Sequence, residues 1–221
     1  MTWNWGFAIE IFPIIASAIW LVLAVTLGAY FVAAIFGLIL TFLRRTKYKM
    51  LTYVTNGFIE FVRSTPPLIQ LFFVYFALPT IGISLDKYTA GILTLGIHYS
   101  TYLAEVYRSG IDAVPMGQWE AAKAMNFSKA QTWFRVILPQ AIPPVLPMMG
   151  NYLIVLFKET PLLMAIGVHE FLQEAKLVGA EYFRYLEAYT IVGLLFLLLS
   201  YPSAMLIHYL EKRLNMKKVR G

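Results

Sequence analysis

The chain has 221 residues, of which 59% are hydrophobic and only 14% are charged, and its mean hydropathy is +0.66. This composition excludes an ordinary soluble globular protein and predicts a membrane protein. The net charge of +6 could indicate nucleic-acid binding, but basic residues between long apolar runs are explained more simply as setting the orientation of the chain in a bilayer. The lack of cysteine excludes disulfides and thiolate metal sites. The length allows one membrane domain, which we expect to cover residues 1–221.

Five apolar stretches, taken in chain order, are long enough or nearly long enough to cross a bilayer as helices. They lie between the charged residues at positions 10 and 44, 63 and 86, 87 and 105, 135 and 158, and 187 and 211. We therefore expect an all-α membrane protein with five transmembrane helices and its two termini on opposite sides. The fourth stretch contains several prolines, so we expect its regular helix to start after them. These prolines are Pro139, Pro143, Pro144 and Pro147.

Two segments leave alternatives open. In the first stretch Ala29, Ala33 and Gly37 recur every four residues, a pattern that lets another helix approach closely, either within the subunit or from a second subunit. After the fourth stretch, the segment 169–189 either receives a soluble partner outside the membrane or forms an interfacial helix that seals the bundle.

The positions of lysine and arginine predict the orientation. Thirteen of them follow the first, third and fifth stretches, whereas Lys87, Lys176 and Arg184 lie on the opposite side. The positive-inside rule then places the N-terminus outside and the C-terminus in the cytoplasm. The first ten residues contain no lysine or arginine, so we expect a retained first span rather than a cleaved signal peptide.

The loop between the third and fourth stretches, residues 112–140, is long enough to carry structure or function of its own. Residues 118–125 are good helix formers, and Glu120 lies in the first turn, where its charge suits the helix dipole. Ala121 and Ala122 give this helix a surface small enough to enter a groove on a partner protein.

A turn and a second helix are expected to follow. Asn126 tolerates the left-handed conformation that ends many helices. Ser128 and Gln131 form a capping-box pattern that starts the second helix, and the pair Leu138 and Pro139 is expected to end it. The loop is therefore predicted to be a helical hook on the cytoplasmic face.

The string EAAKAMNFSKAQTWFRVILP resembles the EAA loop of permeases from binding-protein-dependent ABC importers. Val136 replaces the isoleucine of that pattern conservatively, and Asn126 replaces its glycine. The segments FVRSTPPLIQLFFVYF, TYLAEVYRSGIDAVPMGQWEAA and GNYLIVLFKETPLL resemble the polar amino acid branch, which includes histidine and glutamine permeases, although Ser64 and Pro67 depart from its pattern. The similarity covers nearly all of the chain. The residues that match the EAA pattern in register are Glu120, Ala121, Ala122, Leu138 and Pro139.

This resemblance implies the five-span fold of a type I ABC importer permease in the bacterial cytoplasmic (inner) membrane. It also implies an identical or homologous second permease, an ABC ATPase dimer that uses ATP and Mg, and an extracytoplasmic solute-binding protein. The chain itself would bind no cofactor and catalyse no reaction, and its sequence contains no GK pair and hence no phosphate-binding loop. ATPase coupling would involve Glu120, Ala121, Ala122, Asn126, Leu138 and Pro139.

Polar side chains within the expected spans are candidates for the solute pathway, because they are costly in lipid. Each is equally able to bond a neighbouring helix. Gln70 follows Pro66 and Pro67, where a broken helix would free backbone carbonyls. Lys158 and Glu159 either bind the two ends of a zwitterionic solute or pair as an internal lock at the helix break. We favour the lock. The candidates are Gln70, Tyr102, Asn151, Tyr152, Lys158 and Glu159.

The absence of any other acid in the cores of the five stretches argues against a strongly cationic solute and favours a neutral zwitterion. Several segments are similar to permeases for ectoine and hydroxyectoine. An ion-coupled carrier or a channel remains the alternative, whereas an intramembrane enzyme is disfavoured because His98, His169 and His208 fall in separate segments.

Overall fold

The computed structural model describes residues 2–219, with side chains to residue 214, and all regular elements within that range are helices. The segments η1 and η3 are π-helical, and η2 and η4 are 3-10 helices. The elements are α1 (Trp5–Ala16), α2 (Ile19–Arg44), α3 (Lys49–Ser64), α4 (Pro67–Phe72), η1 (Phe73–Ala77), η2 (Leu78–Ile81), α5 (Lys87–Asp112), α6 (Met116–Ala124), α7 (Lys129–Gln131), η3 (Thr132–Ile137), α8 (Leu138–Glu159), η4 (Thr160–Ile166), α9 (Phe171–Tyr182) and α10 (Tyr185–Val219).

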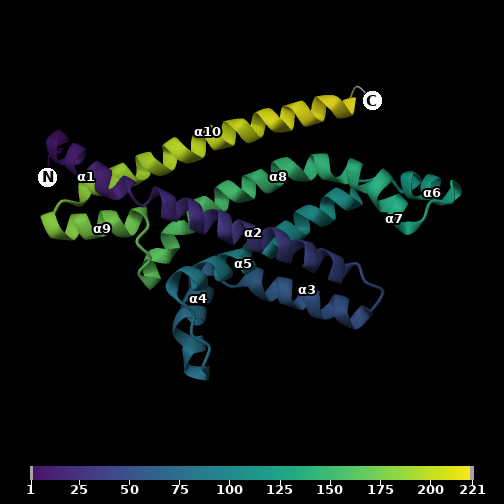
Figure 1. Ribbon diagram of the computed structural model, residues 1–221, viewed down its shortest axis with the longest axis horizontal. Coiled ribbons are helices and arrows are strands. Elements are labelled where there is room, and N and C mark those ends of the chain that lie inside the picture. Colours follow the sequence, from purple (N-terminus) through teal and green to yellow (C-terminus); the bar gives the residue numbers. More distant parts are fainter. Residues whose placement is uncertain (1, 220–221) are drawn as a thin grey trace.

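The long helices α2, α5, α8 and α10 follow the long axis of the molecule (Figure 1). The N-terminus and α9 lie at one end of this axis, and α6 and α7 lie at the other. We call these the α9 end and the α6 end. Arg220, which entered the orientation argument, lies outside the described residues, as do the side chains of Lys217 and Lys218.

Three helical segments in the described part of the chain are long and apolar enough to cross a membrane: Trp5–Arg44, Lys129–Ile166 and Tyr185–Leu214. The pair Lys49–Ser64 and Pro67–Ile81 makes a fourth if it is one broken span, although its two parts are bent by 102°. The chain is therefore a multi-pass membrane protein, and five spans remain a prediction. The expected break near Pro66 is confirmed, but this span begins at Lys49 rather than after residue 63.

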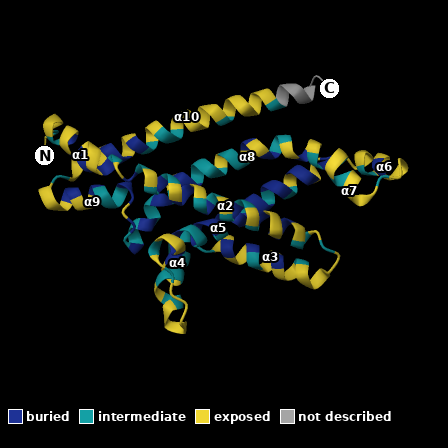
Figure 2. Cartoon of the chain, viewed as in Figure 1, coloured by how far each residue is buried: buried dark blue, intermediate teal, exposed yellow. Residues whose placement is uncertain are grey.

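Helix α5 occupies the expected third stretch, but it is not among the described segments that are apolar enough to cross a membrane by themselves. It is 26 residues long, and 15 of these residues are buried, including Thr94, His98 and Thr101. Because its polar side chains contact neighbouring helices rather than lipid, α5 does not need the high hydropathy of a peripheral span. In Figure 2 the buried residues concentrate on α5, whereas α10 is largely exposed.

The expectation that the fourth helix starts after its prolines is wrong. Helix α8 begins at Leu138 and continues through Pro143, Pro144 and Pro147. Pro139 lies in its first turn, where a missing N–H is tolerated, and the wider π turn η3 precedes it. The later prolines each remove one donor, a loss that membrane helices accommodate through their neighbours.

The small residues of α2 face α5 within the same chain, which resolves the first open alternative in favour of packing inside the subunit. Ala29 and Ala33 are fully buried. A Cβ at Gly37 would lie 2.9 Å from the carbonyl oxygen of Ser100, and one at Gly96 would lie 3.0 Å from that of Ala29. The two backbones therefore approach as closely as glycine permits.

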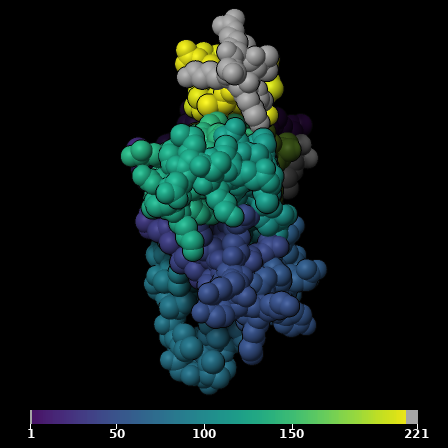
Figure 3. Space-filling view, turned by 90° about the vertical axis from the view of Figure 1, so that its right-hand side faces the viewer, coloured from purple at the N-terminus to yellow at the C-terminus, as the bar shows by residue number. Residues whose placement is uncertain are grey.

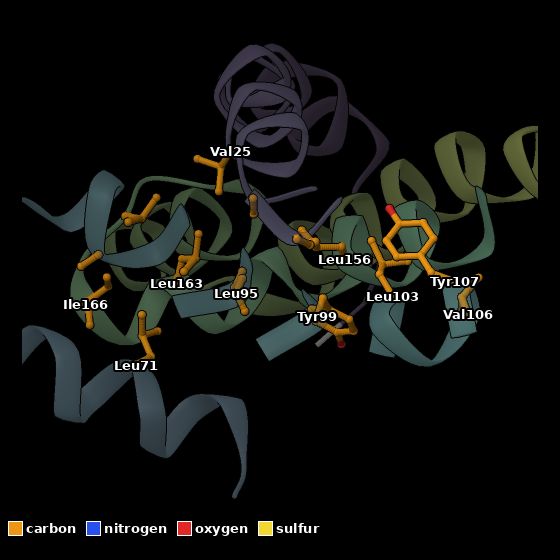
Figure 4. Packing of buried hydrophobic residues seen from close by; sticks show 14 of the residues in the cluster. Val25, Leu71, Leu95, Tyr99, Leu103, Val106, Tyr107, Leu156, Leu163 and Ile166 are labelled. Atoms are coloured by element: carbon orange, nitrogen blue, oxygen red, sulfur yellow. The ribbon is translucent and has the colours of Figure 1, made fainter. Parts of the chain in front are cut away.

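The main apolar core joins α2, α4, α5, α8 and η4 (Figure 4). Leu71 from α4 and Leu163 and Ile166 from η4 lie near one end of the drawn cluster, and Tyr107 from α5 lies near the other. This core fixes the base of α4, while α4, η1 and η2 project from the bundle (Figure 1).

Candidate functional site

The loop of residues 112–140 forms the expected hook. Helix α6 spans Met116–Ala124, and both Glu120 and Ala121 are exposed on it. Ala122 is 2% exposed and so packs against the chain itself. The surface available to a partner protein therefore contains Glu120 and Ala121 but not Ala122.

The turn of the hook has the predicted local structure. Asn126 has a φ of 57°, in the left-handed region. The Gln131 N–H donates to Ser128 Oγ at 3.3 Å, and the Ser128 N–H donates to Gln131 Oε1 at 2.8 Å, which completes the capping box. The predicted helix end at Leu138 and Pro139 is wrong, because α7 continues through η3 into α8.

The hook is anchored to the long helices by aromatic and aliphatic contacts. The rings of Trp119 and Trp133 meet edge to face with centroids 5.4 Å apart. They pack against a buried cluster that includes Ile111 of α5 and Ala141 of α8. Figure 3 looks onto the α6 end, where the green residues of the hook lie between α10 above and α3 below. A force applied to α6 is therefore transmitted to both α5 and α8.

A cluster of charged side chains joins the α6 ends of α2 and α5, and Arg63 near the opposite end of α3 lies at its edge. Glu105 accepts from Arg44 and from Arg108, whose Nη2 is 2.8 Å from Glu105 Oε2. Asp112 accepts from Arg45 at 2.7 Å and from Arg108 at 3.0 Å. The sequence analysis missed this cluster, although the spacing of residues 105, 108 and 112 is typical of charge pairs along one helix face.

Aromatic side chains from α5 and α8 gather where these two helices face each other. Tyr102 lies 5.8 Å from Tyr99 and 5.7 Å from Tyr152, measured between ring centroids. His98 lies 5.5 Å from Tyr102. We call Tyr99, Tyr102 and Tyr152 the tyrosine cluster. It brings together two candidates from the sequence, Tyr102 and Tyr152, and adds Tyr99, which was missed.

Charged groups flank the tyrosine cluster. The guanidinium carbon of Arg63 lies 4.8 Å from the ring centre of Tyr102. Glu159 lies two turns after Tyr152 on the same face of α8. A cation and an anion next to hydroxyl groups are the components that a zwitterionic solute requires.

The favoured lock between Lys158 and Glu159 does not form in this structure. Lys158 is exposed, and neither residue has an ion-pair partner within 4.0 Å among the described side chains. Successive residues on a helix point about 100° apart, so only Glu159 of the two is directed toward the tyrosine cluster.

Gln70 stabilises the helix break rather than facing the tyrosine cluster. Its Nε2 donates to the carbonyl oxygen of Val62 at 2.7 Å and to that of Thr65 at 3.2 Å. Its Oε1 lies 3.1 Å from His98 Nδ1. Gln70 also lines an apolar cavity of about 310 Å³ inside the bend. Asn151, another sequence candidate, is exposed and makes no side-chain hydrogen bond within the described residues.

The position of Glu60 bears on the expectation that the solute is not strongly cationic. Glu60 lies on α3, in the bent pair that forms a fourth span if its two parts cross together, and it is exposed without an ion pair to another described side chain. The sequence argument against a cationic solute assumed no further acid at this depth. If the bent pair is one span, it contains a further acid, and cationic amino acids are then not disfavoured.

The segment at the α9 end packs against the bundle, as the sealing alternative requires. Phe171, Ala175 and Val178 of α9 are buried against α1 and α10. The buried carboxylate of Glu170 accepts from the backbone N–H groups of Leu172 and Gln173 at 2.9 and 2.8 Å. Burial raises the pKa of Glu170 to about 7.

The fold and the hook define a multi-pass helical membrane protein with an anchored helical projection at one end. A family model described as the inner membrane component of binding-protein-dependent transport systems matches residues 33–216. The chain belongs to this family of permease subunits, which are transport components.

Individual relatives agree with this assignment. The chain is 39% identical over 223 residues to a probable amino-acid ABC transporter permease of Sinorhizobium fredii, covering 99% of this chain and 96% of the relative. It is 35% identical over 181 residues to a probable glutamine ABC transporter permease of Bacillus subtilis, covering 82% and 84%. The crystal structure of an amino acid ABC transporter with histidines matches with a TM-score of 0.90 at 31% identity, covering 96% of this chain and 100% of that one.

Proposed function

We propose that this chain is the permease subunit of an ATP-driven, binding-protein-dependent importer in the bacterial cytoplasmic membrane. Its solute is a polar amino acid or a related zwitterion such as ectoine or hydroxyectoine. The observation that carries the proposal is the α6 hook, whose exposed Glu120 and Ala121 are anchored through Trp119 and Trp133 to α5 and α8. The amino-acid permeases among the relatives support the solute class.

The hook lies on the cytoplasmic side in this proposal, and the N-terminus lies outside. The arginines at the α6 end agree with the positive-inside rule. An ABC ATPase dimer, which binds ATP and Mg, receives α6 with Glu120 and Ala121 in its groove. Ala122, Asn126, Leu138 and Pro139 maintain the shape of the hook. A second permease, identical or homologous, completes the pathway.

The transport mechanism is alternating access. A loaded binding protein docks at the α9 end, the ATPases close, and α6 moves with the ends of α5 and α8. The tyrosine cluster lies between these two helices, so their movement changes access to it. We place the solute at this cluster, with Tyr102, Tyr152 and Glu159 in contact with it. In this arrangement the solute does not contact Gln70, Asn151 or Lys158 directly.

The test is ATP hydrolysis by the complete importer in lipid nanodiscs with its binding protein. The panel contains neutral, basic and acidic amino acids, ectoine and hydroxyectoine. We expect one class to stimulate hydrolysis, and Glu120→Ala to abolish that stimulation. The matched control is Glu211→Ala, an exposed glutamate on α10 away from both the hook and the α9 end. Solute uptake that persists without ATP or the ATPase would refute the proposal and identify an ion-coupled carrier or a channel.

A further inference from the structure

The charged cluster at the α6 end contains more cations than anions. Four guanidinium groups, those of Arg44, Arg45, Arg63 and Arg108, surround two carboxylates, those of Glu105 and Asp112. Both carboxylates have close partners. The cluster therefore carries an excess positive charge that its own acids do not neutralise.

Arg63 is the most weakly paired cation of the four. Its Nη1 lies 4.0 Å from Glu105 Oε1, at the limit of an ion pair, whereas Arg108 approaches Glu105 to 2.8 Å and Arg45 approaches Asp112 to 2.7 Å. Arg44 is also hydrogen-bonded to Glu105. The side chain of Arg63 is 41% exposed, so its remaining N–H donors are accessible.

The environment of Arg63 requires an anion. Arg63 lies on α3 within the broken candidate span, where an unpaired charge is costly. Glu60, one turn earlier on the same helix, forms no ion pair with it. The face of Tyr102 supplies a cation–π contact but cannot satisfy the planar set of donors.

We infer that Arg63 binds the carboxylate of the transported solute at the edge of the tyrosine cluster. This inference rests on the proposed function and adds the residue that recognises the acid group. A guanidinium offers two parallel N–H donors to a carboxylate, and Tyr102 fixes its plane by stacking. The 4.0 Å separation between Glu105 and Arg63 leaves those N–H donors available to the solute. The site therefore selects solutes that carry a carboxylate over their uncharged amides.

The experiment separates this step from recognition by the binding protein. The permease–ATPase complex is placed in nanodiscs without binding protein, and binding is measured by saturation-transfer NMR. The probes are L-glutamine, L-histidine and ectoine, each compared with the same molecule in which the α-carboxylate, or ectoine's single carboxylate, is a carboxamide. A charged hydrogen-bond pair predicts a preference of about 10- to 100-fold for the acid in the wild type.

We expect Arg63→Gln to remove this preference, and Arg63→Lys to keep the charge but only part of the preference. Arg45→Gln is the matched control, because Arg45 contacts Asp112 and not the tyrosine cluster, so its preference should equal that of the wild type. If Arg63→Gln does not assemble, Arg63→Lys decides, since an unchanged preference in that variant would overturn the inference.

The two proposals fail differently. An Arg63→Gln complex that keeps the full preference for the acid, in an importer with ATP-dependent uptake, would overturn the role of Arg63 alone. Its guanidinium would then pair with a carboxylate of the second permease. A wild-type complex that shows neither ATP-dependent uptake nor binding of any probe would overturn both proposals.

Discussion

Gln70 was a solute candidate in the sequence, but its contacts predict a role in stabilising the helix break. Pro66 and Pro67 have no N–H, so the carbonyls of Val62 and Arg63 lose the donors that a continuous helix would supply. The Gln70 amide replaces one of these donors at 2.7 Å from the Val62 oxygen and also binds the Thr65 oxygen at 3.2 Å. Because the amide is occupied, it is not available to a solute in this conformation.

The substitution Gln70→Leu keeps the size of the side chain and removes its hydrogen bonds to Val62, Thr65 and His98. The Thr65 hydroxyl still donates to the Val62 carbonyl at 3.2 Å, whereas the Thr65 carbonyl is left without a side-chain donor. One half-buried carbonyl without a donor costs about 1–3 kcal/mol, so we expect the free energy of unfolding to fall by about that amount. The affinity for solute should stay within about threefold of the wild type, because this variant leaves Arg63 and the tyrosine cluster intact.

Denaturant titration in mixed micelles measures the stability, and equilibrium binding in nanodiscs measures the affinity. Gln140→Leu is the matched control, since Gln140 donates to the Val136 carbonyl at 2.8 Å but is exposed to solvent. We expect that control to change stability by less than about 1 kcal/mol. Unchanged stability of Gln70→Leu together with a large loss of solute affinity would refute the reasoning and restore Gln70 to the solute site.

Three further predictions concern packing, pH and the hook. A Cβ at Gly96 would lie 2.6 Å from Val32 Cβ, so Gly96→Ala should lower stability by about 1–3 kcal/mol in the same titration, whereas Gly57→Ala, with open space around it, should not. The pKa of Glu170 is about 7 in the folded protein and 4.5 ordinarily. The folded state thus holds this proton more tightly, and its contribution to stability, at most about 3 kcal/mol, is complete below pH 4.5 and lost as the pH rises through 7. Glu170→Gln should abolish that slope in titrations from pH 4 to 8. Asn126→Val should cost about 1–2 kcal/mol because a β-branched residue resists the left-handed conformation, and hydrogen exchange should show faster opening of α6.

The hook was predictable because its signals are local. A capping box and a left-handed helix end each depend on residues within a few positions, and both are found at Ser128 and Asn126. The end of the second helix was not predictable in the same way. Whether a helix tolerates Pro139 depends on its place in the first turn and on the π turn before it, and neither is written in the local pattern.

The segment around Pro66 shows why the ends of a span cannot be located from the positions of charged residues alone. Counting uncharged residues treats every charged residue as the end of a span, which placed Glu60 and Arg63 at or beyond a boundary. In the structure these residues lie on α3, in the bent pair that is a candidate span. Arg63 is held there by Glu105 and Tyr102 of α5, contacts between residues about 40 positions apart in the sequence. Tyr102 and Tyr152 were accessible to sequence reasoning as polar groups in apolar runs, but their pairing was not.

The packing of α2 against α5 limits how alternating access can occur. A Cβ at Gly37 would lie 2.9 Å from the Ser100 carbonyl, and Thr41 Oγ1 lies 3.2 Å from the Ala104 carbonyl. Side chains on helices this close interlock, so sliding or rotating α5 along α2 would require several contacts to break together. We therefore expect α2 and α5 to move as one body with the hook, and the motion to occur where α4 and η1 leave the bundle or where a second permease packs. A disulfide engineered across the α2–α5 contact between cysteines at positions 41 and 104, which already carry side chains, should then leave ATP-dependent uptake intact. Loss of uptake on oxidation that is restored by reduction would show that the two helices move relative to each other.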